Sequence, residues 1–188
     1  MHCNVSAAQM LYHVSEEAGI RRFEPRPSEY TDEPVVWAVD AERLRNYLLP
    51  RDCPRVTFYA GPETTAVDRE RHLGQSPAVV AIEEGWVDRV ACCRLYGYRM
   101  PPQTFACLDE CAGYFVSREG VTPVSVQIYE DAISELRRRG VELRVLSNLW
   151  PLRDAIVEST LQFSMIRMRN ALPRAIPPAD QADSPEKS

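Results

Sequence analysis

Short apolar runs separated by polar turns dominate the chain from Met10 onward. Several of these runs are rich in β-branched and aromatic residues, which is typical of buried strands, and they lie at 10–13, 35–39, 56–60 and 77–82. The last of them is apolar throughout and is therefore expected to be a central strand. Residues 94–100 are expected to form a strand with one side exposed to water. Segments 113–117 and 121–128 are expected to pair as a hairpin, and 141–146 to be the last strand.

Helical patterns are short and fall between these runs. Asp40 is expected to cap a helix over 41–49 that ends at Pro50, and Asp131 to cap a helix over 132–139 that ends at Gly140. Shorter helical segments are expected at 66–73, 85–92 and 152–160, whereas 161–170 fits a helix or a strand equally well. The pattern predicts an α+β fold: a compact mixed or antiparallel β-sheet core with short flanking helices, without regular βαβ alternation.

The two ends of the chain lack this pattern. Residues 1–9 show no apolar period, and from Pro173 onward the composition turns to Pro, Asp, Ala, Ser and Lys. The sequence therefore predicts a disordered N-terminal extension (1–9), a single globular domain (10–172) and a disordered tail (173–188). A chain of 188 residues lies within the usual size of one domain.

Charge and cysteine content exclude several classes of function. The 22 basic and 27 acidic residues give a net charge of −5, which opposes binding to nucleic acid or to an anionic membrane. The sequence has no secretory signal pattern and no apolar run of about 18 residues, so a cytoplasmic protein with reduced thiols is expected. The spacing of Cys107 and Cys111 has no second Cys/His pair beside it, so no metal is expected.

His13 is the main titratable candidate near neutral pH, because the second histidine of the patterned region, His72, is expected to be exposed. The alternative is a core histidine whose ring bonds to the backbone. Ser15 would point to the same side of an extended segment. The arginines of the loop 21–26, Arg26 among them, can form an anion-binding rim. No G-x-S-x-G segment is present, which argues against a serine hydrolase.

Arg51 and Arg55 flank a proline-containing turn and are candidates for binding phosphate or carboxylate. The alternative is that they bond to Asp52 or to carbonyls of the loop. Trp37 and Tyr47 can stack on a base or a nicotinamide ring, although a Trp in a buried strand is more often part of the core. Glycine-rich phosphate loops are absent, which excludes kinase, P-loop and Rossmann functions.

Three segments together resemble the ADP-ribosyltransferase-like superfamily. They are the first strand with YH-x-S (Tyr12, His13, Ser15), the segment VWAVDAERLRNYL and the late AGYFVSREGVTPVSV. From Met10 to Pro173 the chain also resembles an uncharacterised bacterial family, a domain of unknown function, whose members share LYHVSEE, LPRDCPRV, AGYFVS, LWPL and IRMRN.

The superfamily resemblance implies that His13 anchors the ribose of NAD, that Ser15 supports it and that Tyr47 or Tyr114 flanks the nicotinamide. It implies His13 and Arg51 as catalytic residues, in a cleft with Ser15 and Tyr114. The full set of residues expected to bind the cofactor is His13, Ser15, Arg26, Trp37, Tyr47, Arg51, Arg55 and Tyr114. The expected glutamate is missing at the start of the late hairpin, where Gly113 and Tyr114 stand.

Two functions follow as expectations. The first is a nucleotide- or NAD-binding transferase of ADP-ribosyltransferase-like fold without an obvious catalytic glutamate. The second is a non-catalytic module on the same scaffold that recognises a small anionic ligand or a protein. The expected partner is thus a small anionic or nucleotide ligand, with no membrane, and an RNA-directed activity is opposed by the net charge. The sequence predicts no oligomeric state.

Overall fold

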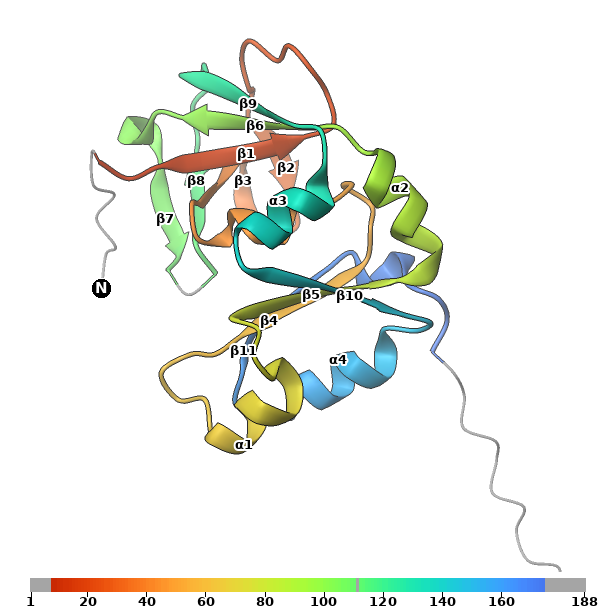
Figure 1. The fold of residues 1–188 in the computed structure, drawn as a ribbon. Coiled ribbons are helices and arrows are strands. Elements are labelled where there is room, and N and C mark those ends of the chain that lie inside the picture. Colours follow the sequence, from red (N-terminus) through yellow and green to blue (C-terminus); the bar gives the residue numbers. More distant parts are fainter. Residues whose placement is uncertain (1–7, 111, 175–188) are drawn as a thin grey trace, which may run out of the picture.

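Two β-sheets form the framework of the computed structural model, which describes residues 8–110 and 112–174 (Figure 1). The first sheet has seven strands in the described part of the chain, in the order β7-β8-β3-β1-β6-β9 with β2 added beside β3, and every pair in it is antiparallel. Its strands are β1 (Leu11–Ser15), β2 (Arg26–Ser28), β3 (Thr31–Asp40), β6 (Leu95–Met100), β7 (Ala106–Asp109), β8 (Tyr114–Ser117) and β9 (Ser125–Tyr129).

The second sheet has four strands in the described residues, in the order β10-β5-β4-β11. They are β4 (Arg55–Tyr59), β5 (Ala78–Glu83), β10 (Val141–Leu146) and β11 (Gln162–Ile166). β5 is buried along its whole length and lies between β4 and a parallel β10, which confirms the predicted central strand. A mixed α+β fold with a largely antiparallel core is thereby confirmed.

Short helical segments connect the strands. They are η1 (Arg43–Tyr47), α1 (Ala66–Asp68), η2 (Arg69–Leu73), η3 (Glu84–Trp86), α2 (Val87–Cys92), η4 (Pro102–Thr104), α3 (Ala132–Arg138), α4 (Trp150–Val157) and η5 (Met168–Asn170). Figure 1 shows α3 between the two sheets, and α1 and α4 on the other side of the second sheet. The predicted cap of α3 is confirmed, because Asp131 Oδ1 accepts a hydrogen bond from Ser134 N at 2.9 Å. Gly140 follows this helix with a left-handed φ of 72°.

Three apolar clusters fill the spaces around the sheets. The first lies between the sheets and joins η1, α2 and α3 to one face of β5, with Leu44, Val80 and Leu136 as members. The second covers the opposite face of β5 with α4, and the third covers the outer face of the first sheet. Because β5 is buried on both faces, its sequence is apolar throughout instead of alternating.

Four expectations are corrected. β8 pairs with β7 and β3 while β9 pairs with β6, so these strands are not a hairpin; Val121, between them, bridges to Phe23 instead. The expected helix over 41–49 is reduced to the 3-10 turn η1, although Asp40 Oδ1 does accept from Arg43 N at 2.6 Å. His72 is buried, because η2 packs its C-terminal end onto the second sheet.

The fourth correction concerns the C-terminal part of the fold. β10 is not the last strand, since residues 162–166 form β11 at the edge of the second sheet and η5 follows it. The ambiguous segment thus becomes a strand where it reaches the free edge of β4. Most of the predicted extension and tail, residues 1–7 and 175–188, lies outside the described residues.

Candidate functional site

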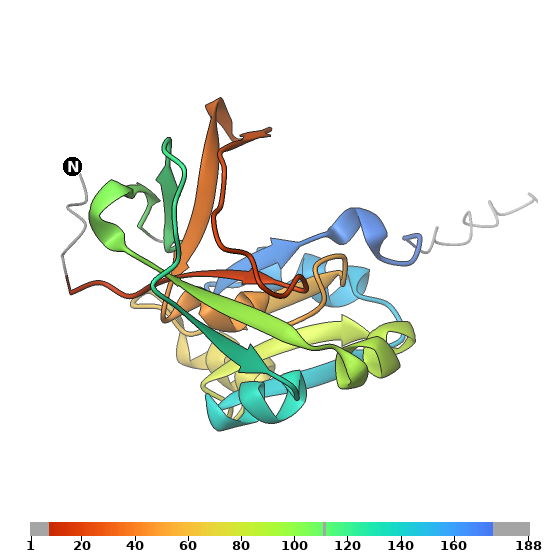
Figure 2. The same cartoon turned by 90° about the horizontal axis from the view of Figure 1, so that it is seen from above.

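β1 and β3 separate soon after they begin to pair. Their ladder contains Leu11↔Asp40 and Tyr12↔Val39, whereas all five residues of β1 pair with β6. The first half of β3 lies away from β1 and pairs with β2 between Thr31 and Val35 (Figure 2). We call the place between these two ladders, at Trp37, the fork. A strand edge that loses its partner leaves backbone groups that need another hydrogen-bond partner.

His13 supplies that partner at the fork. Its Nδ1 lies 2.8 Å from the carbonyl oxygen of Trp37, which can only accept, so Nδ1 is the donor. The ring of Phe23 lies against the imidazole with the centroids 4.6 Å apart. Both contacts fix the ring orientation.

Burial lowers the pKa of His13 below its ordinary value of 6.5. The Trp37 carbonyl acts in the opposite direction, and the positive charges of Arg51 and Arg26 lower the pKa further. His13 is therefore neutral at pH 7. With Nδ1 protonated, its Nε2 carries a lone pair that accepts a hydrogen bond or a proton.

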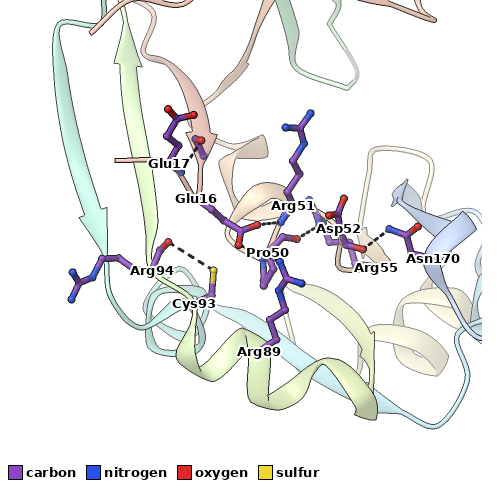
Figure 3. A network of polar contacts seen from close by, with 11 residues as sticks. Glu16, Glu17, Pro50, Arg51, Asp52, Arg55, Arg89, Cys93, Arg94 and Asn170 are labelled. Atoms are coloured by element: carbon purple, nitrogen blue, oxygen red, sulfur yellow. Dashed lines mark hydrogen bonds and ion pairs between the residues drawn. The ribbon is translucent and has the colours of Figure 1, made fainter. Parts of the chain in front are cut away.

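Arg51 stands on a turn that side chains from two sides hold in place (Figure 3). The backbone N–H of Arg51 donates to Glu16 Oε1 at 2.8 Å, and Glu16 Oε2 pairs with Arg89 at 3.4 Å. The carbonyl of Asp52 accepts from Asn170 Nδ2 at 2.7 Å. The Arg51 side chain points away from the turn in Figure 3, and its charge reaches His13.

Arg26 lies on β2 and is exposed. Within the described part of the chain, the guanidinium groups of Arg26 and Arg51 have neither a hydrogen bond nor an ion pair, whereas many of the other arginines are bound to carboxylates or carbonyls. Two unpaired cations near one neutral histidine favour the binding of an anion.

Trp37, Tyr114 and Tyr47 form a second group. The Trp37 ring meets the Tyr114 ring edge-on with the centroids 5.8 Å apart, and Tyr47 Oη donates to Tyr114 Oη at 3.0 Å. The strand register places Trp37 and Tyr114 on the face of the sheet opposite to Ala38. Burial raises the pKa of Tyr47, so this phenol stays protonated at neutral pH. Trp37 connects this group to His13 through its carbonyl.

Arg55 belongs to the interior. It is 2 % exposed, and its guanidinium donates to the carbonyls of Asn46, Pro50 and Cys53 at 2.7, 3.2 and 2.9 Å. Burial lowers its pKa to about 10. The structure thus places Arg55 below the Arg51 turn as a support for that turn, with its donors already used, and it matches the alternative that the loop carbonyls would bind it.

Ser15 is half-buried at the end of β1, where its Oγ accepts from Glu17 N at 3.0 Å. This bond shapes the exit of the strand. Among the predicted residues, the structure brings His13, Arg26 and Arg51 together and gathers Trp37, Tyr47 and Tyr114 beside them.

Sequence reasoning missed Glu16, Asn170 and Arg167. Glu16, directly after β1, and Asn170, at the end of η5, hold the Arg51 turn, and only the fold brings these two residues near it. Arg167 follows β11 with a φ of 56°, a left-handed conformation that is uncommon outside glycine, and its positive charge acts on Tyr47 and Arg55. The signal that pointed to this segment was the motif IRMRN.

Two further observations concern the site's surroundings. In residues 8–110 and 112–174, no group of three or more His, Cys, Asp or Glu side chains is arranged to hold a metal ion. None of the helices described there has the length and apolar character that a membrane crossing requires.

Comparison with known proteins gives one match. Searches against curated proteins and against solved structures found no significant relative. The model of a family of unknown function, DUF6886, matches residues 12–171, which include every residue described above for the fork and for the Arg51 turn. Because this match covers most of the chain, the protein belongs to the DUF6886 family.

Proposed function

We propose that this chain binds a nucleotide, NAD or a related phosphorylated nucleoside, at the fork, and that it acts as a transferase of ADP-ribosyltransferase-like fold. The observation that carries the proposal is the neutral His13, whose donor nitrogen is bound to Trp37 O and whose pKa is lowered by burial and by the charges of Arg51 and Arg26. The histidine on the first strand is also the feature on which the sequence resemblance depends.

The tautomer of His13 favours a ligand with a sugar hydroxyl. A neutral imidazole with a protonated Nδ1 has only an acceptor left, at Nε2, and therefore favours a donor. Ribose hydroxyls are donors, whereas a phosphate or carboxylate offers acceptors that an Nε2 lone pair repels. The His13 ring is held by Trp37 O and Phe23, so binding costs little ordering of this side chain.

The positive charges of Arg51 and Arg26 favour a ligand with a phosphate group. Arg51 rises from a turn fixed by Glu16 and Asn170, and Arg26 lies on the β2 strand. A guanidinium binds phosphate through two parallel hydrogen bonds, and a fixed backbone reduces the entropy lost in doing so. A ligand that carries a ribose and a phosphate matches both kinds of group at once.

The aromatic group takes a supporting role in this proposal. Trp37 contacts Tyr114, and Tyr114 contacts Tyr47, so these rings fix the position of the strand whose carbonyl orients His13. Arg55 supports the Arg51 turn from below through its three carbonyl bonds.

Isothermal titration calorimetry with NAD and with ADP-ribose tests the proposal. We expect binding by the wild type and a loss of about tenfold or more for His13→Ala and for Arg51→Ala, because each removes a hydrogen bond or charge contact worth about 1.5 kcal/mol or more. Arg169→Ala is the matched control, since Arg169 is exposed and lies outside the fork. Absence of binding by the wild type to both ligands would overturn the proposal.

A second candidate is a non-catalytic module on the same scaffold that binds a small anion or a protein. It is favoured by the charges that act on His13, which come from Arg51 and Arg26 and are both cationic, as the binding of an anion requires. Release of nicotinamide from NAD separates the two candidates. Turnover that His13→Ala abolishes supports the transferase, and tight binding without turnover supports the module.

A further inference from the structure

β9 lies at the end of the first sheet (Figure 1). In the described part of the chain it pairs only with β6, through Leu95↔Tyr129 to Arg99↔Ser125. Its outer backbone edge therefore presents N–H and C=O groups to solvent. Such an edge is a template for another strand.

The side chains of this edge are apolar on one face. Val124 is 64 % exposed, Val126 50 % and Ile128 52 %. The register with Tyr98 and Tyr96 places Val126 and Ile128 on the same face of the sheet, and Val124 follows the same alternation. The residues between them, Ser125 and Gln127, are polar and lie on the opposite face.

β9 also lacks the devices that keep an exposed edge from pairing. Free edges in proteins carry lysine, other charges, proline or a bulge. The segment from Val124 to Ile128, VSVQI, contains no charged residue and no proline, and its β-branched residues favour an extended strand. An uncharged apolar edge of this kind is stable in solution only when it is covered.

The sequence of the edge is complementary to itself. If two copies pair antiparallel about a twofold axis at Val126, then Val126 faces Val126 of the other copy, Val124 faces Ile128, and Ser125 faces Gln127. Every apolar side chain then meets an apolar one. Beyond the segment Pro123 faces Tyr129, and the two acidic residues Glu130 and Asp131 face Thr122 and Val121, so no like charges oppose each other.

The neighbouring register fits less well. An axis at Gln127 would place Val124 opposite Glu130, an apolar side chain against a carboxylate that is already paired with Arg94. The register about Val126 is therefore favoured. We propose that the chain forms a homodimer through antiparallel β9–β9 pairing centred on Val126, which joins the two seven-stranded sheets into one.

Sedimentation equilibrium over a wide range of protein concentration tests the assembly. We expect a monomer–dimer equilibrium whose dissociation constant rises by about tenfold or more in Val126→Lys, because two lysines would face each other at the axis. Val67→Lys is the matched control: Val67 is an exposed valine on α1, which lies on the far side of the second sheet from β9 (Figure 1), and its substitution should leave the equilibrium unchanged. Equal thermal stability of the monomers shows that both variants fold.

Cysteine cross-linking tests the register. Val126→Cys should form a disulfide between copies under mild oxidation, because directly opposed β-carbons lie about 5 Å apart. Val124→Cys should not, since positions 124 of the two copies would be about 13 Å apart along the strands. Mass spectrometry of the cross-linked peptide identifies the bond among the native cysteines. A wild type that is monomeric at every concentration, or equal cross-linking at 124 and 126, would overturn the proposal.

Discussion

At the scale of single residues, His13 acts as a substitute for a missing backbone partner. Its Nδ1 donates to the carbonyl oxygen of Trp37 where β1 and β3 separate. The same bond gives this carbonyl a partner and fixes the tautomer of the ring. A core histidine bonded to backbone and a functional histidine were alternative interpretations of the sequence. The structure fits both interpretations. Nδ1 of His13 is bonded to the backbone carbonyl of Trp37, and Nε2 keeps a lone pair that can accept a hydrogen bond.

The lowered pKa of His13 predicts a dependence of stability on pH. Below about pH 6.5 the unfolded chain binds more protons at this residue than the folded chain does. The stabilising contribution is therefore complete above the unfolded pKa and is lost as the pH falls through the folded pKa.

We expect the free energy of unfolding of His13→Gln to fall less steeply than that of the wild type when the pH is lowered from about 7.5 to about 5. Urea denaturation at several pH values measures it. His72→Gln is the control, because it removes the other histidine with a lowered pKa and leaves the contribution of His13 in place. If His13→Gln retains the full slope of the wild type, the burial of a neutral imidazole is contradicted.

At the scale of elements, the hydrogen bonds predicted for single aspartates before helices are present in the structure, but one of the two helices is much shorter than its apolar pattern predicts. Asp40 and Asp131 both accept the backbone N–H three residues on, as their sequence positions indicate. α3 then continues for seven residues, while the segment after Asp40 forms only the short 3-10 turn η1. The carbonyls of Asn46, on η1, and of Pro50, after it, accept hydrogen bonds from the Arg55 guanidinium, a partner that lies outside the segment with the helical pattern.

The cap of α3 predicts a measurable loss. Asp131→Ala should lower the free energy of unfolding and the midpoint of denaturation, because the side chain accepts from both Ser134 N and Ser134 Oγ. Urea denaturation followed by circular dichroism measures it. Asp131→Asn should retain most of the stability, since an asparagine also caps well. An unchanged midpoint for Asp131→Ala would contradict the role of the cap.

At the scale of the whole molecule, Glu83 joins three distant segments. It ends β5, is 2 % exposed, and accepts from Leu149 N at 3.3 Å and from Leu172 N at 3.0 Å. Leu149 precedes α4 and Leu172 follows η5, so this carboxylate anchors the last described segment to the central strand. The same segment contributes Asn170 to the Arg51 turn, which connects the anchor to the candidate site.

Glu83→Gln should therefore lower the free energy of unfolding by about 1–3 kcal/mol, because a buried amide offers one acceptor fewer to the N–H groups of Leu149 and Leu172. Hydrogen exchange at Leu149 and Leu172 should speed up in the same variant. Glu84→Gln is a close control, since the neighbouring Glu84 is exposed. Equal stability and equal exchange in the two variants would rule out the anchoring role.

The sequence by itself determined the features that depend on near neighbours. The apolar run of β5, the cap at Asp131 and the left-handed glycine after α3 were all predicted from residues a few positions apart, and the structure confirms them. These features are local because a strand face, a cap or a glycine turn is specified by the residues of one short segment. The α+β class follows from their order.

Only the tertiary structure decided which segments meet. Segments 113–117 and 121–128 looked like a hairpin, yet β8 pairs with β3 and β7 and β9 pairs with β6, which are strands from distant parts of the sequence. The same holds for the site. Arg51 and Arg55 are four residues apart and chemically alike, but Arg55 is enclosed by carbonyls and Arg51 reaches His13. Charge, burial and partners depend on distant residues, which no local pattern contains.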